Sequence, residues 1–265
     1  MALSKRPILL LAAASLAVFG CQIQAAVLIS DNFDTVATSA DINGRAPVVN
    51  TINGNAWSAT TSSILGSGSG TLIGNPATLS HSASIDLGAD YLTDNPGLYS
   101  LSSQFSFPSG SSALGWVGMG FTPSASTAQN FVGNNGSPWL LYRANGTVIF
   151  FGGPNTLDGT TLGTLATGSA HNFELELDTS GSQWLANVYI DGVQYDLNGS
   201  AAGMSFALGS AANFSHYIGL ATGVNGTTTV SGTIDNFVFE AVPEPRVTLL
   251  LGLSFGMLFM RRRRL

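Results

Sequence analysis

Three carboxylates at alternating positions are the residues of this chain best placed to do chemistry. They are Glu174, Glu176 and Asp178, with leucines at the two positions between them. Residues two apart in an extended strand point to the same side, so the acids are expected on one face and the leucines on the other. Neighbours on such a face lie roughly 7 Å apart at the backbone, and retaining glycoside hydrolysis uses two carboxyl groups about 5 Å apart. This acidic row is therefore a candidate for acid–base chemistry on a glycan.

The acidic row also has a structural interpretation. Acids that alternate with leucines are typical of a strand with one face buried and the other face in water. No aromatic residue that would grip a sugar occupies the outward positions of this strand. A row of carboxylates without a supporting pocket does not define an active site. We therefore predict a non-catalytic protein and assign no catalytic residue.

Other residue patterns indicate no metal or cofactor site. The histidines are scattered and lack the spacing of a metal site, and no serine lies in a Gly-x-Ser-x-Gly motif. Aspartates in loops are a residue type that binds calcium, but here they lack the EF-hand spacing. We assign no metal and no cofactor. The residues considered are His81, His171, His216, Asp31, Asp34 and Asp235.

A second candidate for ligand contact is the group of Trp139, Tyr142 and Arg143. Arg143 and Arg45 are the two basic residues between the end segments of the chain. A guanidinium can stack on an aromatic ring of a ligand or hold a carboxylate at the edge of the core, and both interpretations stay open for Arg143. The tryptophans are predicted mainly as core residues. They are Trp57, Trp116, Trp139 and Trp184.

Short strands are the elements that must position these residues. Apolar residues come in runs of period two, without long helical periodicity, and Asn-Gly and Asp-Gly pairs mark tight turns. This pattern predicts an all-β domain in which the first and last strands lie side by side. The predicted strands are 27–34, 98–107, 115–121, 139–144, 147–151, 173–178, 183–190 and 232–240, with 60–74 as a long loop or an edge strand.

Apolar matching predicts the register of one hairpin around the turn 179–182. A slip of one residue would send every side chain to the opposite face, so the match of apolar positions is restrictive. The predicted pairs are Asp178–Gln183, Leu177–Trp184, Leu175–Ala186 and Phe173–Val188.

The succession of strands resembles the concanavalin-like or laminin-G-like jelly roll. The resemblance implies an antiparallel two-sheet sandwich with long loops at its ends. Sugar binding is common in this fold, and bacterial β-glucanases that share it carry a Glu-x-Asp-x-Glu strand in the sugar cleft. The acidic row departs from that order. The resemblance is carried by residues 31–34, 173–181, 188–194 and 234–237.

Charge and cysteine content restrict the function of the body further. The body between the end segments contains two arginines, eleven aspartates and three glutamates, which gives it a formal charge of −12. Such a surface repels phosphate backbones, so we expect no nucleic-acid partner. Cys21 is the single cysteine and lies before the body, which therefore has no disulfide.

The tail of the chain combines three features in a fixed order. A proline motif is followed by an apolar, predicted transmembrane segment at 247–260 and then by a run of arginines. The segment is short for a bilayer core, but flanking arginines extend its reach by snorkelling. This order resembles the PEP-CTERM sorting signal of Gram-negative bacteria, which implies cleavage of the tail by a membrane exosortase. The matching residues are Val242, Pro243, Glu244, Pro245, Arg261, Arg262, Arg263 and Arg264.

The start of the chain resembles a secretory signal peptide. Lys5 and Arg6 precede an apolar run, and small residues follow at Ala25 and Ala26. We expect cleavage after one of these alanines, and the alternative is lipidation at Cys21. The predicted organisation is a signal peptide at 1–26, a β-sandwich at 27–240 and a sorting tail at 241–265.

Two functional hypotheses follow. In the first, the chain is an exported, non-catalytic surface or biofilm-matrix protein with weak contact to carbohydrate. Its partners are signal peptidase, exosortase, transiently the inner membrane, and exopolysaccharide. In the second, it is a glycan-degrading or glycan-binding protein that uses the acidic row.

Overall fold

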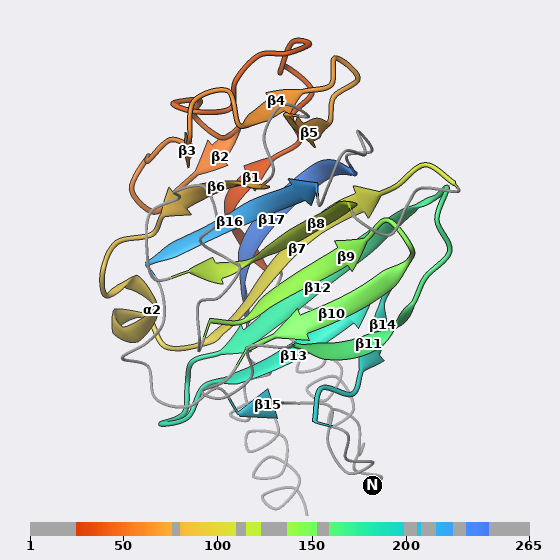
Figure 1. Cartoon of the computed structure of the whole chain (residues 1–265). Helices are drawn as coiled ribbons and strands as arrows, with labels where there is room; N and C mark the ends of the chain where they lie inside the picture. The colour runs from red at the N-terminus through yellow and green to blue at the C-terminus, as the bar shows by residue number, and fades with distance from the viewer. Residues whose placement is uncertain are drawn as a thin grey trace, which may run out of the picture.

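Two antiparallel sheets form the described body in the computed structural model of this chain (Figure 1). The structure describes residues 25–75, 80–109, 115–122, 137–152, 159–198, 206–207, 216–224 and 232–243. Sheet A contains β1 (Ala26–Asp31), β2 (Val49–Asn50), β4 (Ile64–Gly66), β5 (Leu72–Gly74), β7 (Leu98–Ser106), β12 (Ala170–Asp178), β13 (Leu185–Ile190), β14 (Val193–Tyr195), β15 (Phe206–Ala207) and β17 (Thr233–Val242). Sheet B contains β3 (Ser58–Ala59), β6 (Ser80–Asp86), β8 (Gly115–Thr122), β9 (Trp139–Arg143), β10 (Thr147–Phe151), β11 (Thr160–Thr164) and β16 (Tyr217–Val224). One short helix, α2 (Tyr91–Asp94), precedes β7.

The strand order departs from the chain order, as expected for a jelly roll. Sheet A runs β14-β13-β12-β7-β17-β1-β2, with β15, β4 and β5 attached to it, and sheet B runs β11-β10-β9-β8-β16-β6-β3. The all-β, two-sheet prediction is therefore confirmed. Figure 1 shows the strands of the two sheets running in similar directions, which is the aligned packing of a sandwich.

The core lies between the sheets and is built by alternation along each strand. On β12, Phe173, Leu175 and Leu177 are fully buried, whereas the residues between them are partly exposed. Burial of a large apolar side chain contributes about 1.5–3 kcal/mol, so this face fixes the orientation of β12. Its opposite face carries the acidic row.

The first and last strands pair, as the sequence predicts. Ala26 of β1 lies opposite Ala241 of β17, and Asp31 lies opposite Phe237. The predicted ends differ by a few residues, because β1 ends at Asp31 and β17 continues to Val242. Two residues assigned to the sorting tail therefore belong to the sheet.

The hairpin of β12 and β13 forms, but its predicted register is wrong by two residues. Leu177 pairs with Ala186 rather than with Trp184. The N–H of Thr179 donates to the carbonyl of Gly97 at 2.8 Å. Thr179 is therefore engaged outside the hairpin, and the connection between β12 and β13 is longer than the predicted turn. A shift of two leaves every side chain on its predicted face. The observed pairs are Phe173–Ile190, Leu175–Val188, Leu177–Ala186 and Asp178–Leu185.

Two further turns and one loop were predicted from local sequence. β9 and β10 pair around Asn145-Gly146, and β13 and β14 pair around Asp191-Gly192. Both glycines have positive φ angles, 88° and 77°, which is the backbone conformation that favours glycine. The segment 60–74 is a small antiparallel pair, β4 and β5, because Ile64 and Leu72 are buried in the core.

Most of both end segments lies outside the described residues. This part includes residues 1–24 with Cys21, Glu244, Pro245, the apolar segment 247–260 and the arginine run. Ala26, the last residue of the predicted signal peptide, belongs to β1. In the portion that the structure describes, no helix has the length and apolar character needed to cross a membrane.

Candidate functional site

The acidic row lies on the outer face of sheet A, where β12 runs between β13 and β7. Glu174 Oε1 accepts a hydrogen bond of 2.7 Å from the hydroxyl of Ser100. Glu176 accepts hydrogen bonds from the amide of Asn187 at 3.4 Å and from the phenol of Tyr189. The first two acids of the row are therefore held by neighbouring strands.

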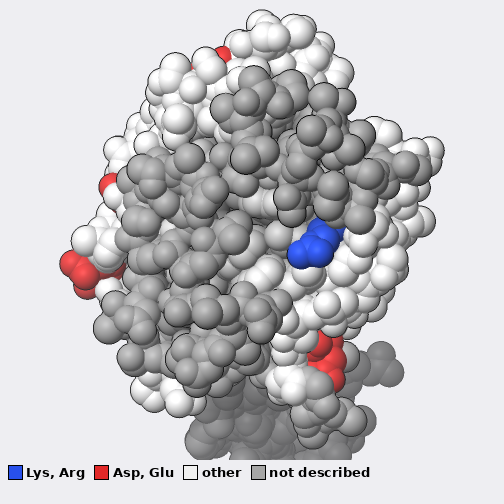
Figure 2. All heavy atoms as spheres, viewed as in Figure 1, with Lys and Arg blue, Asp and Glu red and all other residues white. Residues whose placement is uncertain are grey.

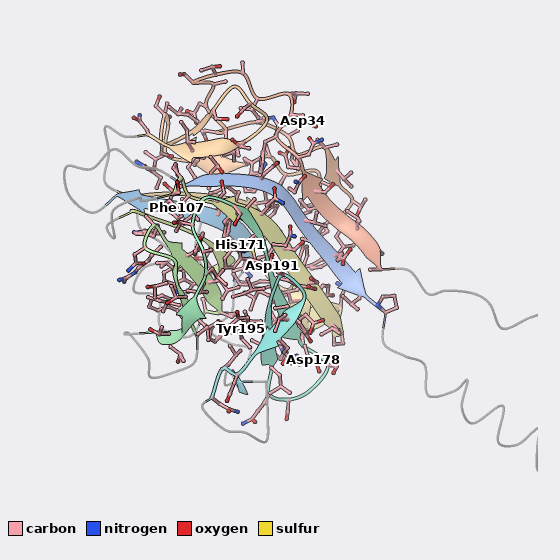
Figure 3. All side chains as sticks on the ribbon, turned by 90° about the vertical axis from the view of Figure 1, so that its right-hand side faces the viewer. Asp34, Phe107, His171, Asp178, Asp191 and Tyr195 are labelled. Atoms are coloured by element: carbon pink, nitrogen blue, oxygen red, sulfur yellow. The ribbon has the colours of Figure 1, made fainter. Side chains whose placement is uncertain are left out.

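Asp178 has its hydrogen-bond partner in the turn after β12, unlike the other two acids. Its Oδ1 accepts hydrogen bonds from the N–H and the hydroxyl of Ser180, at 2.9 and 2.6 Å. Figure 3 shows Asp178 near one end of sheet A, far from the labelled pair His171 and Asp191. Asp178 therefore closes the turn after β12.

Burial and mutual repulsion alter the electrostatics of this face. Burial raises the pKa of Glu176 above 4.5, and the charge of Glu174 adds to the rise, although the hydrogen bond from Tyr189 opposes it. Burial, with the hydrogen bond to Glu176, raises the pKa of Tyr189 to about 12. Burial and the charge of Glu174 also raise the pKa of Glu240 on β17. The charge of Glu174 thus acts on one acid of its own strand and on one acid of β17.

A hollow of about 320 Å³ lies beside Glu174 and is lined by residues of β12, β7 and β17. Glu176 and Asp178 do not line it. A glycosidase needs two carboxyl groups on either side of one scissile bond. This arrangement supplies one carboxylate to the hollow together with hydroxyl and amide groups. It is suited to hydrogen bonding with a polar ligand.

The second predicted group is not part of this site. Trp139 and Arg143 lie on β9 of sheet B, whereas the acidic row lies on sheet A. Trp139 is 2% exposed and stacks on Phe151 with ring centroids 4.1 Å apart. The side chain of Tyr142 points into the core, where its ring contacts Phe107 at a centroid distance of 5.3 Å. Tyr142 therefore does not lie at a binding rim.

Arg143 is exposed on the same face of β9 as Trp139, and it lies opposite Trp116 on β8. In Figure 2, basic atoms lie among uncharged described residues, and acidic atoms lie toward the edges of the view. Arg45, the other arginine of the body, pairs with the buried carboxylate of Asp31.

Asp31, His171 and His81 have partners within the protein, whereas the buried Nδ1 of His216 has no hydrogen-bond partner in the described part of the chain. Asp31 is buried against Arg45, and Nδ1 of His171 lies 2.7 Å from Oδ2 of Asp191. His81 is buried, with Nε2 3.2 Å from the carbonyl oxygen of Asn75. Among the residues that the structure describes, no group of three or more His, Cys, Asp or Glu side chains is placed to hold a metal ion.

Several residues of this face were missed by reasoning from the sequence. Ser100, Tyr189 and Glu240 come from three different strands, and their proximity to the acidic row depends on the pairing order of sheet A. The register of the strands identifies them as neighbours of the acidic row, and no local sequence motif does so.

The strand order defines an all-β, two-sheet jelly-roll domain. No protein-family model matches the sequence, and no curated protein matches it. Among solved structures, an endo-1,3-beta-glucanase from Streptomyces sioyaensis is similar at a TM-score of 0.51 and 17% identity, over 84% of this chain and 98% of the glucanase.

A sialidase of Trypanosoma rangeli, in complex with the inhibitor DANA, is similar at a TM-score of 0.52 and 13% identity. The match covers 84% of this chain and 32% of the sialidase. The carbohydrate recognition domain of Emp46p has a TM-score of 0.46 at 11% identity, over 77% of this chain and 97% of that domain. The glucanase and the sialidase share the fold of this chain, and their low identities leave its activity open.

Proposed function

We propose that this chain is an exported, non-catalytic β-sandwich protein of the cell surface or biofilm matrix, whose body contacts carbohydrate weakly. The observation that carries the proposal for the body is the outer face of sheet A. There, Glu174 lines a hollow of about 320 Å³ together with Ser102, Gln104 and Asn172. Carboxylate, hydroxyl and amide groups are hydrogen-bond partners for sugar hydroxyls. The glucanase and the sialidase add an analogy at the level of fold only.

The proposal for delivery rests on the sequence of the two ends. Signal peptidase would remove the first segment, and an exosortase would cut the tail after a transient stop in the inner membrane of a Gram-negative bacterium. The first strand begins at Ala26 and the last strand ends at Val242, and these two strands pair. Cuts at the predicted positions would therefore remove only terminal residues of β1 and β17. Exopolysaccharide is the proposed extracellular partner.

The mass of the mature protein tests the proposal for delivery. We expect a chain that begins after Ala25 or Ala26 and lacks the tail from the proline motif onward. A mass that includes a lipid on Cys21 would support the alternative start. Recovery of the uncut chain from the cytosol would falsify the delivery proposal.

Glycan hydrolysis is the second candidate, and the raised pKa of Glu176 beside Glu174 favours it. A proton donor next to a second carboxylate is the requirement of glycoside hydrolysis. Against it, the carboxylate of Glu176 is already engaged by Asn187 and Tyr189 and does not line the hollow. Non-catalytic contact is therefore the better proposal.

An assay of the purified full-length chain against soluble β-glucans separates the two candidates. We expect no release of reducing ends by the wild type and the same result for Glu174→Gln. Hydrolysis by the wild type that falls about a hundredfold or more in Glu174→Gln would establish the catalytic alternative.

A further inference from the structure

A second hollow on the outer face of sheet A lies next to the one at Glu174. It measures about 190 Å³ and is lined by residues of β1 and β17 together with Val48. Asn236 and Val238 of β17 line both hollows. The two hollows therefore adjoin at β17, and we refer to them together as the groove.

A bulge in β17 shapes the groove. Asp235 pairs with Gln104, and the next pair is Val238 with Ser102, so β17 holds one residue more than β7 at this point. Asn236 has a φ of 50°, which asparagine tolerates better than most residues. A bulge bends its strand and ends local pairing, which opens a depression between β17 and its two neighbours.

The groove crosses the strands. Glu174 pairs with Ser102, Ser102 with Val238, and Val238 with Ser30 of β1. These four residues lie in one row on four adjacent strands, and three strand spacings amount to roughly 14 Å. Glu174 and Ser30 mark the two ends of the row. Such a length suits an extended chain of sugar rings better than a single ring.

The lining of the groove selects against anionic ligands. Its acids are Glu174 and Asp31, and Asp31 is paired with Arg45. No lysine or arginine lines either hollow in the described part of the chain. An anionic polymer would therefore be repelled.

We propose that this groove binds a linear, uncharged polysaccharide, with Glu174, Ser102, Asn236 and Ser30 as its contact residues. The inference rests on the proposed contact of the body with carbohydrate, and it adds the place and the class of the ligand. Sugar hydroxyls donate to the carboxylate and accept from the serine hydroxyls and the asparagine amide. Val238 supplies an apolar floor in the middle of the row.

Binding of the full-length chain, purified in a mild detergent, to soluble polysaccharides tests this groove. The probes are laminarin and dextran, which are uncharged, and alginate, which is anionic. We expect the wild type to bind an uncharged probe in isothermal titration calorimetry. In Ser102→Trp the indole fills the groove, and we expect the affinity to fall about tenfold or more, which corresponds to at least ~1.4 kcal/mol.

Ser106→Trp is the matched control. Ser106 lies on the same strand and has the same partial exposure, but it lines neither hollow. We expect its affinity to equal that of the wild type. Asn236→Gly is a second groove variant, which keeps the positive φ and removes the amide, so it tests the site if Ser102→Trp does not fold.

The outcomes separate the two proposals. If the wild type binds none of the probes, the proposed carbohydrate contact fails, and the groove proposal fails with it. If the wild type binds but the groove variants bind equally well, the groove is overturned while the carbohydrate contact stands. Preference for alginate would overturn the uncharged class of ligand.

Discussion

The guanidinium of Arg45 donates to the carboxylate of Asp31, whose side chain is fully buried at the end of β1. The indole of Trp57 donates to the same Oδ2 atom at 2.9 Å, and the N–H of Phe33 donates to Oδ1 at 3.1 Å. A buried carboxylate is costly unless it is paired and hydrogen-bonded. These contacts therefore fasten β1, and through it β17, to the loops that carry Arg45 and Trp57.

Removing Arg45 should destabilise the fold strongly. In Arg45→Met the carboxylate of Asp31 stays buried without its cation, and loss of one partner of a buried pair costs about 3–5 kcal/mol. Chemical denaturation gives the free energy of unfolding. Arg143→Met, which changes an exposed arginine, should stay within about 0.5 kcal/mol of the wild type. Equal effects of the two variants would contradict this role of Arg45.

Stability should depend on pH through His171 and Asp191. Burial lowers the pKa of His171. Its hydrogen bonds with Asp191 and Ala166 raise the pKa by more than burial lowers it, so the net pKa lies above 6.5. Its stabilising contribution is then complete below pH 6.5 and is lost as the pH rises through the folded-state pKa. Burial raises the pKa of Asp191, but the hydrogen bond with His171 outweighs burial and holds the pKa below 3.8. The stabilising contribution of Asp191 is therefore lost as the pH falls through its folded-state pKa.

The pair should therefore contribute most between pH 3.8 and 6.5. We expect the free energy of unfolding to fall between about pH 5 and about pH 9 in the wild type, and to fall less in His171→Gln. Asp191→Asn should flatten the same slope. The prediction fails if the wild type and both variants have the same slope.

Glu174 should control the titration of its acidic neighbours. Its charge contributes to the raised pKa of Glu176 and of Glu240, after the larger effect of burial. In Glu174→Gln both pKa values should therefore decrease, because one cause is removed while burial remains. Carbon-13 NMR titration of the carboxyl groups measures them. Asp178→Asn is the control, and a decrease as large in that variant would argue against the role of Glu174.

The indole of Trp116 lies over Gly223, its partner on the neighbouring strand β16. A Cβ atom on Gly223 would meet the indole ring. We expect Gly223→Ala to destabilise the fold by about 1–3 kcal/mol through overpacking and to change tryptophan fluorescence. A Cβ atom on Gly163 would lie 3.7 Å from Tyr195, an ordinary contact, so Gly163→Ala should be nearly neutral. Similar stabilities for the two variants would exclude overpacking.

Period-two burial made much of the sheet architecture predictable. Leu175 and Leu177 alternate with acids, and a strand is the conformation that sends them to opposite sides. The glycine turns at Gly146 and Gly192 needed only local backbone chemistry, because asparagine and aspartate followed by glycine favour positive φ. These features depend on neighbours in the chain, so the amino-acid sequence was enough to determine them.

The candidate site depended on contacts between distant residues. The sequence placed Tyr142 beside Arg143 as a ligand contact, but alternation sends the phenol into the core and the guanidinium outward. The row from Glu174 to Ser30 joins residues more than a hundred positions apart, and its groove requires the bulge at Asn236. Strand order and register follow from the packing of the whole core, so only the tertiary structure decided which polar residues share a face.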